Sequence, residues 1–216
     1  MKRMITRMMC MLALCTGLTL ASAQTPRQVL DATASVFSGK KGVKAQFKAD
    51  SFVKGELKGS VSGTMCIQGN KFQMTTPSMI TWFNGTTQWS YSKDNEEVNI
   101  STPTDEELQN INPSTFVQLY KSGYDYKMKE TSLRGKTCYE ITLSAQKKNK
   151  DKNLRTIILN IDKSNYDLMC VRMFPKNGKD CTRISVHQLQ KGMNFSASDF
   201  EFTPKDYPKT EIIDLR

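Results

Sequence analysis

The sequence predicts a mainly β (α+β) protein: an unclosed antiparallel β-barrel of about eleven strands with short helices that form a lid. Three observations lead to this prediction. Short alternating apolar and polar runs recur between polar turns, two capping-box sequences mark helices, and one hairpin signal carries both tryptophans. Serial hairpins over such a length favour a strongly curved sheet.

Residues 1–23 have the composition of a secretory signal peptide. Three basic side chains lie within residues 1–7, a mostly apolar run extends to Leu20, and Ala-Ser-Ala at 21–23 is a small-x-small cleavage site. We therefore expect a mature domain over residues 24–216, exported across the inner membrane into the periplasm and free of a membrane span.

The chain has a formal net charge of +10, and loss of the three basic residues of the signal peptide leaves +7. This charge favours anionic surfaces such as membrane head groups, and it fits a solubilising surface charge equally well. Nucleic acid is not an expected partner, because an exported protein rarely meets it. No metal site is expected either, since the sequence has no C-x-x-C spacing and one histidine, His187.

Four cysteines remain in the mature chain: Cys66, Cys138, Cys170 and Cys181. An even number in an oxidising compartment allows two disulfides with three connectivities. Cys170 and Cys181 fall on consecutive predicted strands and have the parity to share a face, so they are a candidate disulfide. Four free buried thiols are the alternative.

The mature chain should open with a helix. Thr25 can cap it, Pro26 suits the first helical position, and Gln28 completes a capping box. An apolar stripe continues until Gly39 or Gly42 ends it, which predicts a length of about 13 residues.

Strict alternation at residues 43–49 predicts a half-buried strand directly after this helix. The same kind of pattern predicts the other strands, which are 57–67, 71–74, the two hairpin strands within 80–91, 98–100, 124–128, 137–144, 154–161, 168–174 and 182–189.

The strongest hairpin signal is Asn84-Gly85 between two β-rich runs, because both residues tolerate positive φ. A two-residue loop would place Trp82 opposite Thr87. Four apolar residues of the hairpin then share one face, which is a core or the wall of an apolar cavity: Ile80, Trp82, Trp89 and Tyr91. Phe83 is the apolar exception on the other face.

Two short helices should interrupt the strands. Thr104 and Glu107 form a second capping box, and Asn112-Pro113 starts the next helix. Helices this short are not stable alone, so they must lean on an apolar surface, and we expect them to form the lid. The expected lid residues are Leu108, Phe116, Leu119 and Tyr120.

No enzymatic motif is present. The sequence has no Gly-rich phosphate loop, no H-E-x-x-H and no G-x-S-x-G, and His187 lies in an alternating strand where a surface or sheet histidine explains it. We therefore expect no catalytic residue, no cofactor and no enzyme activity.

A binding function fits the composition better. Methionine and phenylalanine are frequent, and methionine suits adaptable apolar sites, although each one alone could fill a gap in a core. A curved sheet with an apolar concave face and helices across its mouth describes a lipid-sized cavity. The expected wall residues are Phe47, Met65, Ile67, Phe72, Met74, Ile80, Trp82, Trp89 and Tyr91.

The order of several motifs carries a family resemblance. The motifs are the F-x-A-x-F-like strand at Phe47, Ile67-x-x-Asn70-x-Phe72, Pro77, the N-G-x-x-x-W-x-Y hairpin that begins at Asn84, and the F-x-F-T-P ending that begins at Phe200. Together they resemble the LolA-like family of periplasmic carriers of outer-membrane lipoproteins, over nearly all of the mature chain.

The resemblance implies a monomeric carrier with an unclosed barrel and a helical lid. Such a carrier accepts acylated lipoproteins from an inner-membrane ABC-type release complex, shields their acyl chains, and delivers them to an outer-membrane acceptor. Gln68-Gly69 stands where the best-known carriers have an Arg-Pro pair whose arginine helps to hold the lid closed. The alternative is therefore a LolA-fold lipid-binding, protein-interaction or sensor module of the envelope with a different ligand.

Overall fold

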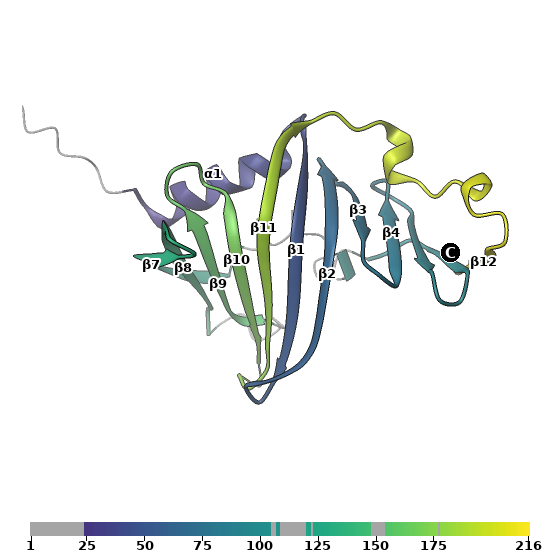
Figure 1. Ribbon diagram of the computed structural model, residues 1–216. Helices are drawn as coiled ribbons and strands as arrows, with labels where there is room; N and C mark the ends of the chain where they lie inside the picture. Colours follow the sequence, from purple (N-terminus) through teal and green to yellow (C-terminus); the bar gives the residue numbers. More distant parts are fainter. Residues whose placement is uncertain (1–23, 105–106, 109–119, 122, 148–153, 177) are drawn as a thin grey trace, which may run out of the picture.

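In the part of the chain that the structure describes, twelve strands form one sheet, accompanied by the helix α1 and two short 3-10 helices (Figure 1). The computed structural model describes residues 24–104, 107–108, 120–121, 123–147, 154–176 and 178–216. The expected signal peptide, residues 1–23, lies outside these ranges. Within them, no helix is both long enough and apolar enough to span a bilayer.

Eleven strands lie where the alternation predicts them, and the C-terminus adds the twelfth. In chain order, the elements are α1 Pro26–Ser38, β1 Gly42–Val53, β2 Glu56–Gln68, β3 Lys71–Thr75, β4 Met79–Phe83, β5 Gln88–Ser92, β6 Glu97–Ser101, β7 Tyr124–Leu133, β8 Lys136–Ala145, β9 Leu154–Asp162, β10 Leu168–Pro175, β11 Cys181–Met193, η1 Ala197–Phe200, η2 Pro204–Asp206 and β12 Glu211–Asp214.

Two antiparallel meanders make up most of the sheet, β1 to β6 and β7 to β11. They join at the centre, where β1 pairs with β11, and β12 pairs in parallel with β6. The sheet therefore has two edges, β12 and β7, which confirms the predicted unclosed barrel. The pairing of β1 with β11 was not predicted, because contacts between distant strands leave no local pattern in the sequence.

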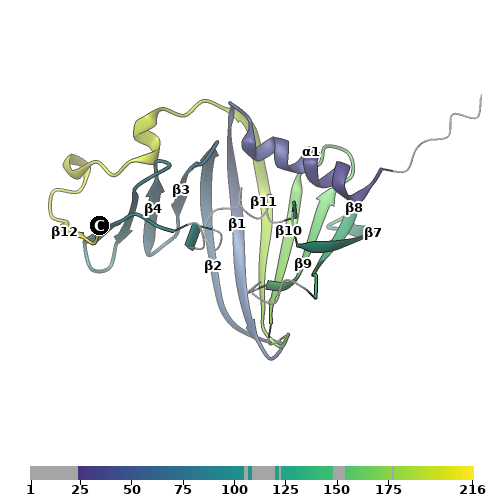
Figure 2. The same cartoon turned by 180° about the vertical axis from the view of Figure 1, so that it is seen from behind.

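The helix α1 forms as its capping box predicts. The side-chain oxygen of Thr25 accepts a hydrogen bond from the backbone N–H of Gln28 at 3.3 Å, and the side chain of Gln28 accepts one from the backbone of Thr25 at 2.8 Å. Its buried side includes Val29, Leu30 and Phe37. The helix lies across one face of the sheet, called the inner face here, and contacts β1, β2 and β7 (Figure 2).

The two faces of the sheet bury different clusters. The inner face holds the main core, in which Val43, Ile67 and Ile141 are almost completely buried together with the apolar side of α1. The outer face holds a smaller cluster built around Trp82 and Phe202. The C-terminal segment between β11 and β12, shown in yellow in Figure 1, crosses this outer face. Phe202 belongs to this segment.

The tryptophan hairpin forms, but its predicted register is wrong. A four-residue loop that begins at Asn84 joins β4 to β5, so Trp82 pairs with Trp89 instead of Thr87. The side-chain oxygen of Asn84 accepts hydrogen bonds from the backbone of Thr86 at 3.1 Å and of Thr87 at 3.0 Å, which stabilises the longer loop. Because the register changes by two residues, the four apolar residues still share one face, as predicted.

The candidate disulfide does not form in this structure. Cys170 pairs with Ser185, and the residue that follows Cys181 pairs with Met173. This register separates the two cysteines by about four positions, roughly 13 Å along the strands, whereas bridged residues need Cα atoms within about 7 Å. All four cysteines are free thiols.

Candidate functional site

An apolar groove lies on the inner face of the sheet. Its volume is about 540 Å³, and it is bounded by α1 and by β1, β2, β3, β9, β10 and β11. The eighteen lining residues include no charged side chain, and the only polar ones are two threonines. They are Phe37, Ala45, Phe47, Ala49, Val61, Met65, Ile67, Met74, Thr76, Leu154, Leu168, Val171, Met173, Pro175, Thr182, Ile184, Val186 and Leu189.

The alternation of β1 explains why the groove is both apolar and open. Ala45, Phe47 and Ala49 point into it, while Gln46 and Lys48 between them are exposed on the outer face. Alanine has a short side chain, so two of the three inward residues leave space instead of filling it. A strand of larger residues at these positions would close the groove with protein atoms.

Gly63 on β2 leaves room for the ring of Phe47 beside it. A Cβ atom at Gly63 would be 2.5 Å from the carbonyl oxygen of Thr75 and 2.9 Å from the Cζ atom of Phe47. Both distances are shorter than atoms can approach without movement. Glycine is therefore required here for the close approach of the β3 backbone and of the Phe47 ring.

The structure places four of the nine predicted wall residues in the groove: Phe47, Met65, Ile67 and Met74. Phe72 is wholly buried in the main core on the same face. Ile80, Trp82, Trp89 and Tyr91 lie on the outer face, so the expectation that they line the same cavity is wrong in position. Ligand contact by the four groove residues stays a prediction.

The strand register explains why these four residues lie on the outer face. Phe72 on β3 pairs with Phe83 on β4, and paired residues lie on the same face. Phe83, the apparent exception of the hairpin, is therefore the inward residue, and Trp82 points outward. There Trp82 packs edge-on against Phe202 and Tyr207, with ring centroids at 5.8 and 5.7 Å.

The part of the groove wall formed by β10 and β11 was not predicted from the sequence. Val171 on β10 pairs with Ile184 on β11, and both line the groove, as does Val186 further along β11. The alternating run at 183–189 contained this signal. It could not be assigned to the same cavity as Phe47, because nothing local shows that β11 pairs with β1.

Two of the four expected lid residues lie in the described part of the chain. Leu108 is half-buried against the main core, and Tyr120 is 1% exposed. Phe116 and Leu119 lie outside the described residues. The predicted second capping box is present, since Thr104 and Glu107 bond reciprocally, with the Thr104 hydroxyl 2.8 Å from the Glu107 carboxylate.

Tyr120 ties the end of the expected lid to α1. Its phenol donates a hydrogen bond to the carboxylate of Asp31 on α1, and its backbone carbonyl accepts one from the hydroxyl of Tyr126. Burial and the adjacent Asp31 carboxylate raise the pKa of the Tyr120 hydroxyl. The phenol therefore stays protonated and can keep donating this hydrogen bond at any physiological pH.

A buried ion pair supports the groove wall from the outer face. The carboxylate of Asp50 on β1 accepts hydrogen bonds from Ser60 on β2 at 2.6 Å and from Arg183 on β11 at 2.8 Å. These contacts lower the pKa of Asp50 to about 2. The charged carboxylate thus joins three adjacent strands behind the groove.

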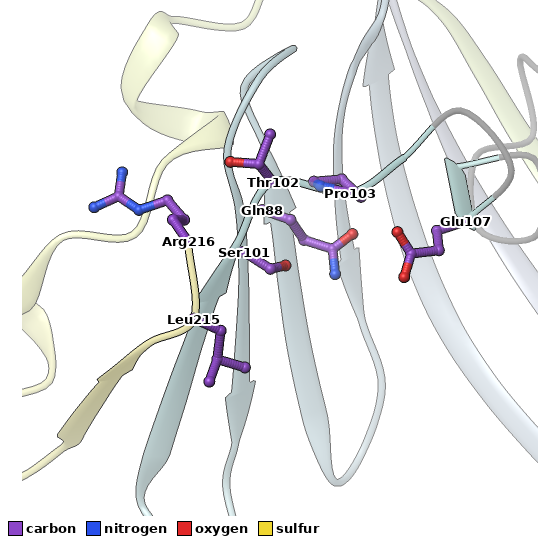
Figure 3. Close-up of a pocket in the computed structure, with 7 residues that line it drawn as sticks. All are labelled: Gln88, Ser101, Thr102, Pro103, Glu107, Leu215 and Arg216. Atoms are coloured by element: carbon purple, nitrogen blue, oxygen red, sulfur yellow. The ribbon is translucent and has the colours of Figure 1, made fainter.

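A second, polar hollow of about 460 Å³ lies beside β5 and β6. Figure 3 shows Gln88 and Glu107 pointing to one side of it, while Arg216 points away. The side-chain oxygen of Gln88 is buried and has no hydrogen-bond partner among the described residues. The hollow is lined mainly by polar side chains, whereas the groove is lined mainly by apolar ones.

His187, the single histidine, lies beside a cation. Its Nδ1 atom is 3.4 Å from the guanidinium of Arg134, which also donates hydrogen bonds to the carbonyls of Met169 at 3.0 Å and Val186 at 2.8 Å. A catalytic histidine is normally oriented by an acid rather than by arginine. Among the described residues, no three potential metal ligands cluster.

Known proteins share this sequence pattern and fold. The sequence matches the family described as outer membrane lipoprotein carrier protein LolA over residues 18–178. No curated protein matches this sequence.

Among solved structures, an uncharacterized conserved protein from Thermus thermophilus has a TM-score of 0.59 at 12% identity, over 88% of this chain and 99% of that chain. The LolA superfamily protein NE2245 from Nitrosomonas europaea has a TM-score of 0.44 at 8% identity, over 83% and 99%. A chain of the Pseudomonas aeruginosa MucA/MucB complex has a TM-score of 0.41 at 11% identity, over 82% and 61%.

At these identities, the likeness to the solved structures concerns the fold alone. The sequence match is different, because it extends over most of the 216 residues and includes the first ten strands of the sheet together with α1. On that match, the chain belongs to the LolA family of outer membrane lipoprotein carrier proteins.

Proposed function

We propose that the protein is a periplasmic carrier of lipoproteins. It holds their acyl chains in the apolar groove while it moves them from the inner to the outer membrane. The observation that carries this proposal is the groove itself, which has no charged side chain among its eighteen lining residues. Family membership supports the same function. Removal of residues 1–23 during export would deliver the mature domain to the periplasm.

The size of the groove suits a lipid chain. Its volume of about 540 Å³ lies within the range of ligand cavities, which is roughly 300–1,000 Å³. Transfer of an acyl chain from water gains about 0.8 kcal/mol per buried methylene, so roughly ten buried methylenes contribute about 8 kcal/mol. That free energy corresponds to a dissociation constant of about 1 µM, which permits both capture and release.

The lid must be held by groups other than the family arginine. Gln68 occupies that part of the chain, and its side chain donates a hydrogen bond to the carbonyl of Lys40 at 2.9 Å, next to the end of α1. We assign the latch to the hydrogen bond between Tyr120 and Asp31, since it joins the end of the expected lid to the helix that covers the groove.

The proposed partners follow from the family. An inner-membrane ABC-type complex would release acylated lipoproteins to the carrier, and an outer-membrane acceptor would take them. The carrier would act as a monomer, without nucleic acid, metal or catalytic chemistry, because shielding an acyl chain requires only an apolar surface.

Photo-cross-linking with a diacylated lipopeptide tests the proposal. The probe carries a diazirine near the end of one acyl chain, and mass spectrometry locates the cross-linked peptides. We expect cross-links to the β10 and β11 peptides that contain Val171 and Ile184, and none to the outer-face peptide that contains Trp82. Cross-links spread evenly over both faces would refute the assignment of the groove.

A matched pair of variants on β1 controls this experiment. Ala49→Trp fills the groove, whereas Gln46→Trp places the same side chain on the exposed outer face of the same strand. Ala49→Trp should abolish cross-linking and Gln46→Trp should leave it unchanged. An equal yield from both variants would show that the chains bind elsewhere.

The second candidate function is a protein-interaction or sensor module on the same fold. It is favoured by one observation: β3 pairs with β2 only from Thr64 onward, so residues 56–63 of β2 lack a β3 partner. An extended peptide could add to such an edge. A peptide-bound, lipid-free protein in native mass spectrometry would favour this function over the carrier.

A further inference from the structure

The hairpin between β1 and β2 projects beyond the rest of the sheet. Residues 56–62 of β2 are all exposed, although they belong to a strand that is buried further along. Figure 1 shows this hairpin as the lowest point of the molecule, next to the turn between β10 and β11. Residues 48–61, 175–176 and 178–183, which belong to these two turns and their flanking strands, are called the tip.

The tip exposes aliphatic side chains to solvent, which is energetically unfavourable. Leu57 is 54% exposed, and Val53 and Val61 are each 39% exposed. Three such residues lie at one end of a projecting hairpin. Their exposure indicates a surface that becomes covered.

Basic side chains surround these aliphatic residues. Lys54, Lys58 and Lys176 are exposed, and the backbone N–H of Lys54 donates to the side chain of Asp180 at 3.3 Å, which holds the two turns together. The tip carries a net charge of +3 from nine charged residues: Lys48, Lys54, Lys58, Lys176, Lys179, Arg183, Asp50, Glu56 and Asp180.

The groove reaches the tip. Val61 lines the groove and is also partly exposed, and Pro175 and Thr182 line the groove at the two ends of the β10–β11 turn. The groove is therefore continuous with the tip at Val61, and no charged residue lines it there.

We propose that the tip docks on the surface of a bilayer that contains anionic phospholipids. The aliphatic side chains enter the head-group region, and the lysines contact lipid phosphates. The inference rests on the proposed carrier function and deepens it, because docking would point the open end of the groove at the membrane where acyl chains enter or leave.

Vesicle flotation of the mature chain, residues 24–216, tests the apolar part of the proposal. Vesicles of phosphatidylcholine alone are compared with vesicles that contain phosphatidylglycerol. We expect binding to the anionic vesicles that weakens as salt rises. Leu57→Ser should weaken it about tenfold. The control Leu215→Ser changes a residue that is 64% exposed near the C-terminus, and it should have no effect.

Charge neutralisation tests the electrostatic part. Each lysine near an anionic surface contributes about a fivefold gain in binding, so Lys58→Gln with Lys176→Gln should weaken flotation about 25-fold. The control pair Lys205→Gln with Lys209→Gln removes two exposed charges from the C-terminal segment and should have little effect. All the changed side chains are exposed, and unchanged thermal unfolding confirms that each variant is folded.

Three results would overturn the docking proposal: no binding to anionic vesicles at low salt, equal loss in the tip variants and their controls, or capture of an extended peptide by the tip without vesicle binding. The carrier proposal fails separately. Flotation that persists while acyl cross-linking is absent would refute the carrier alone, and cross-linking without flotation would refute docking alone.

Discussion

Gly63 offers a sharp test of the groove floor, because the neighbouring atoms leave no room for a methyl group. In Gly63→Ala, the new Cβ atom would lie 2.5 Å from the carbonyl oxygen of Thr75 and 2.9 Å from Phe47. The first contact is with backbone and cannot be relieved by a rotamer change. Phe47 must move into the groove, and β2 and β3 must separate locally.

The size of the effect follows from the cost of overpacking, which is typically about 1–3 kcal/mol. Gly59, four residues earlier on the same strand, is the matched control, since a Cβ atom there meets nothing within 4 Å. Glycine within a strand is less stable than alanine by roughly 0.5–1 kcal/mol, so Gly59→Ala should be neutral or stabilising. Gly63→Ala should therefore lower the free energy of unfolding, whereas Gly59→Ala should not.

Urea unfolding monitored by tryptophan fluorescence measures both variants. A diacyl lipopeptide uptake assay on the same samples should show weaker uptake for Gly63→Ala, because the displaced Phe47 ring occupies part of the groove. If Gly63→Ala stabilises the protein as much as Gly59→Ala does, the packing of Phe47 on Gly63 is not as the structure describes it.

Three further predictions concern the ion pair, the latch and the hairpin loop. The pKa of Asp50 in the folded protein is about 2, below the unfolded value near 3.9, so its contribution to stability is present above about pH 4 and lost as pH falls towards 2. Asp50→Asn should lower the free energy of unfolding by about 1–3 kcal/mol at pH 7, and stability should then fall less steeply between pH 4 and pH 2. Urea unfolding at a series of pH values measures this, and an unchanged pH dependence would contradict it. Tyr120→Phe should cost about 1 kcal/mol and speed acyl release in stopped-flow measurements, whereas an unchanged release rate would exclude the latch. Gly85→Ala should cost about 1–3 kcal/mol, because φ is +103° and the Cβ atom would lie 2.8 Å from Asn70; Asn70→Ala should recover part of that loss, and full additivity of the two changes would argue against the contact.

Local features of the fold could be predicted from the sequence. The Thr25–Gln28 capping box and Pro26 determine where α1 begins, and these interactions involve neighbouring residues only. Alternation at 43–49 identified β1, because side chains that alternate between core and solvent leave a period of two. The Asn84-Gly85 pair indicated the hairpin, because turn formation also depends on neighbouring residues, although the hydrogen bonds of the Asn84 side chain lengthen its loop.

The position of the groove could not be predicted in the same way. Large aromatic residues such as Trp82 are expected on a buried face, and Trp82 is indeed buried. However, Phe202 and Tyr207 cover it on the outer face, and they lie more than a hundred residues later in the sequence. The partner wall at Ile184 likewise depends on the pairing of β11 with β1, which only the folded chain reveals.

Native mass spectrometry of the protein purified from its own periplasm tests the central claim most directly. We predict that a diacylated lipid or lipoprotein co-purifies with the unaltered chain and with Gln46→Trp, and is absent from Ala49→Trp. A clean apo mass for all three proteins, with no uptake of a diacyl probe, would mean that the groove is not an acyl-chain site.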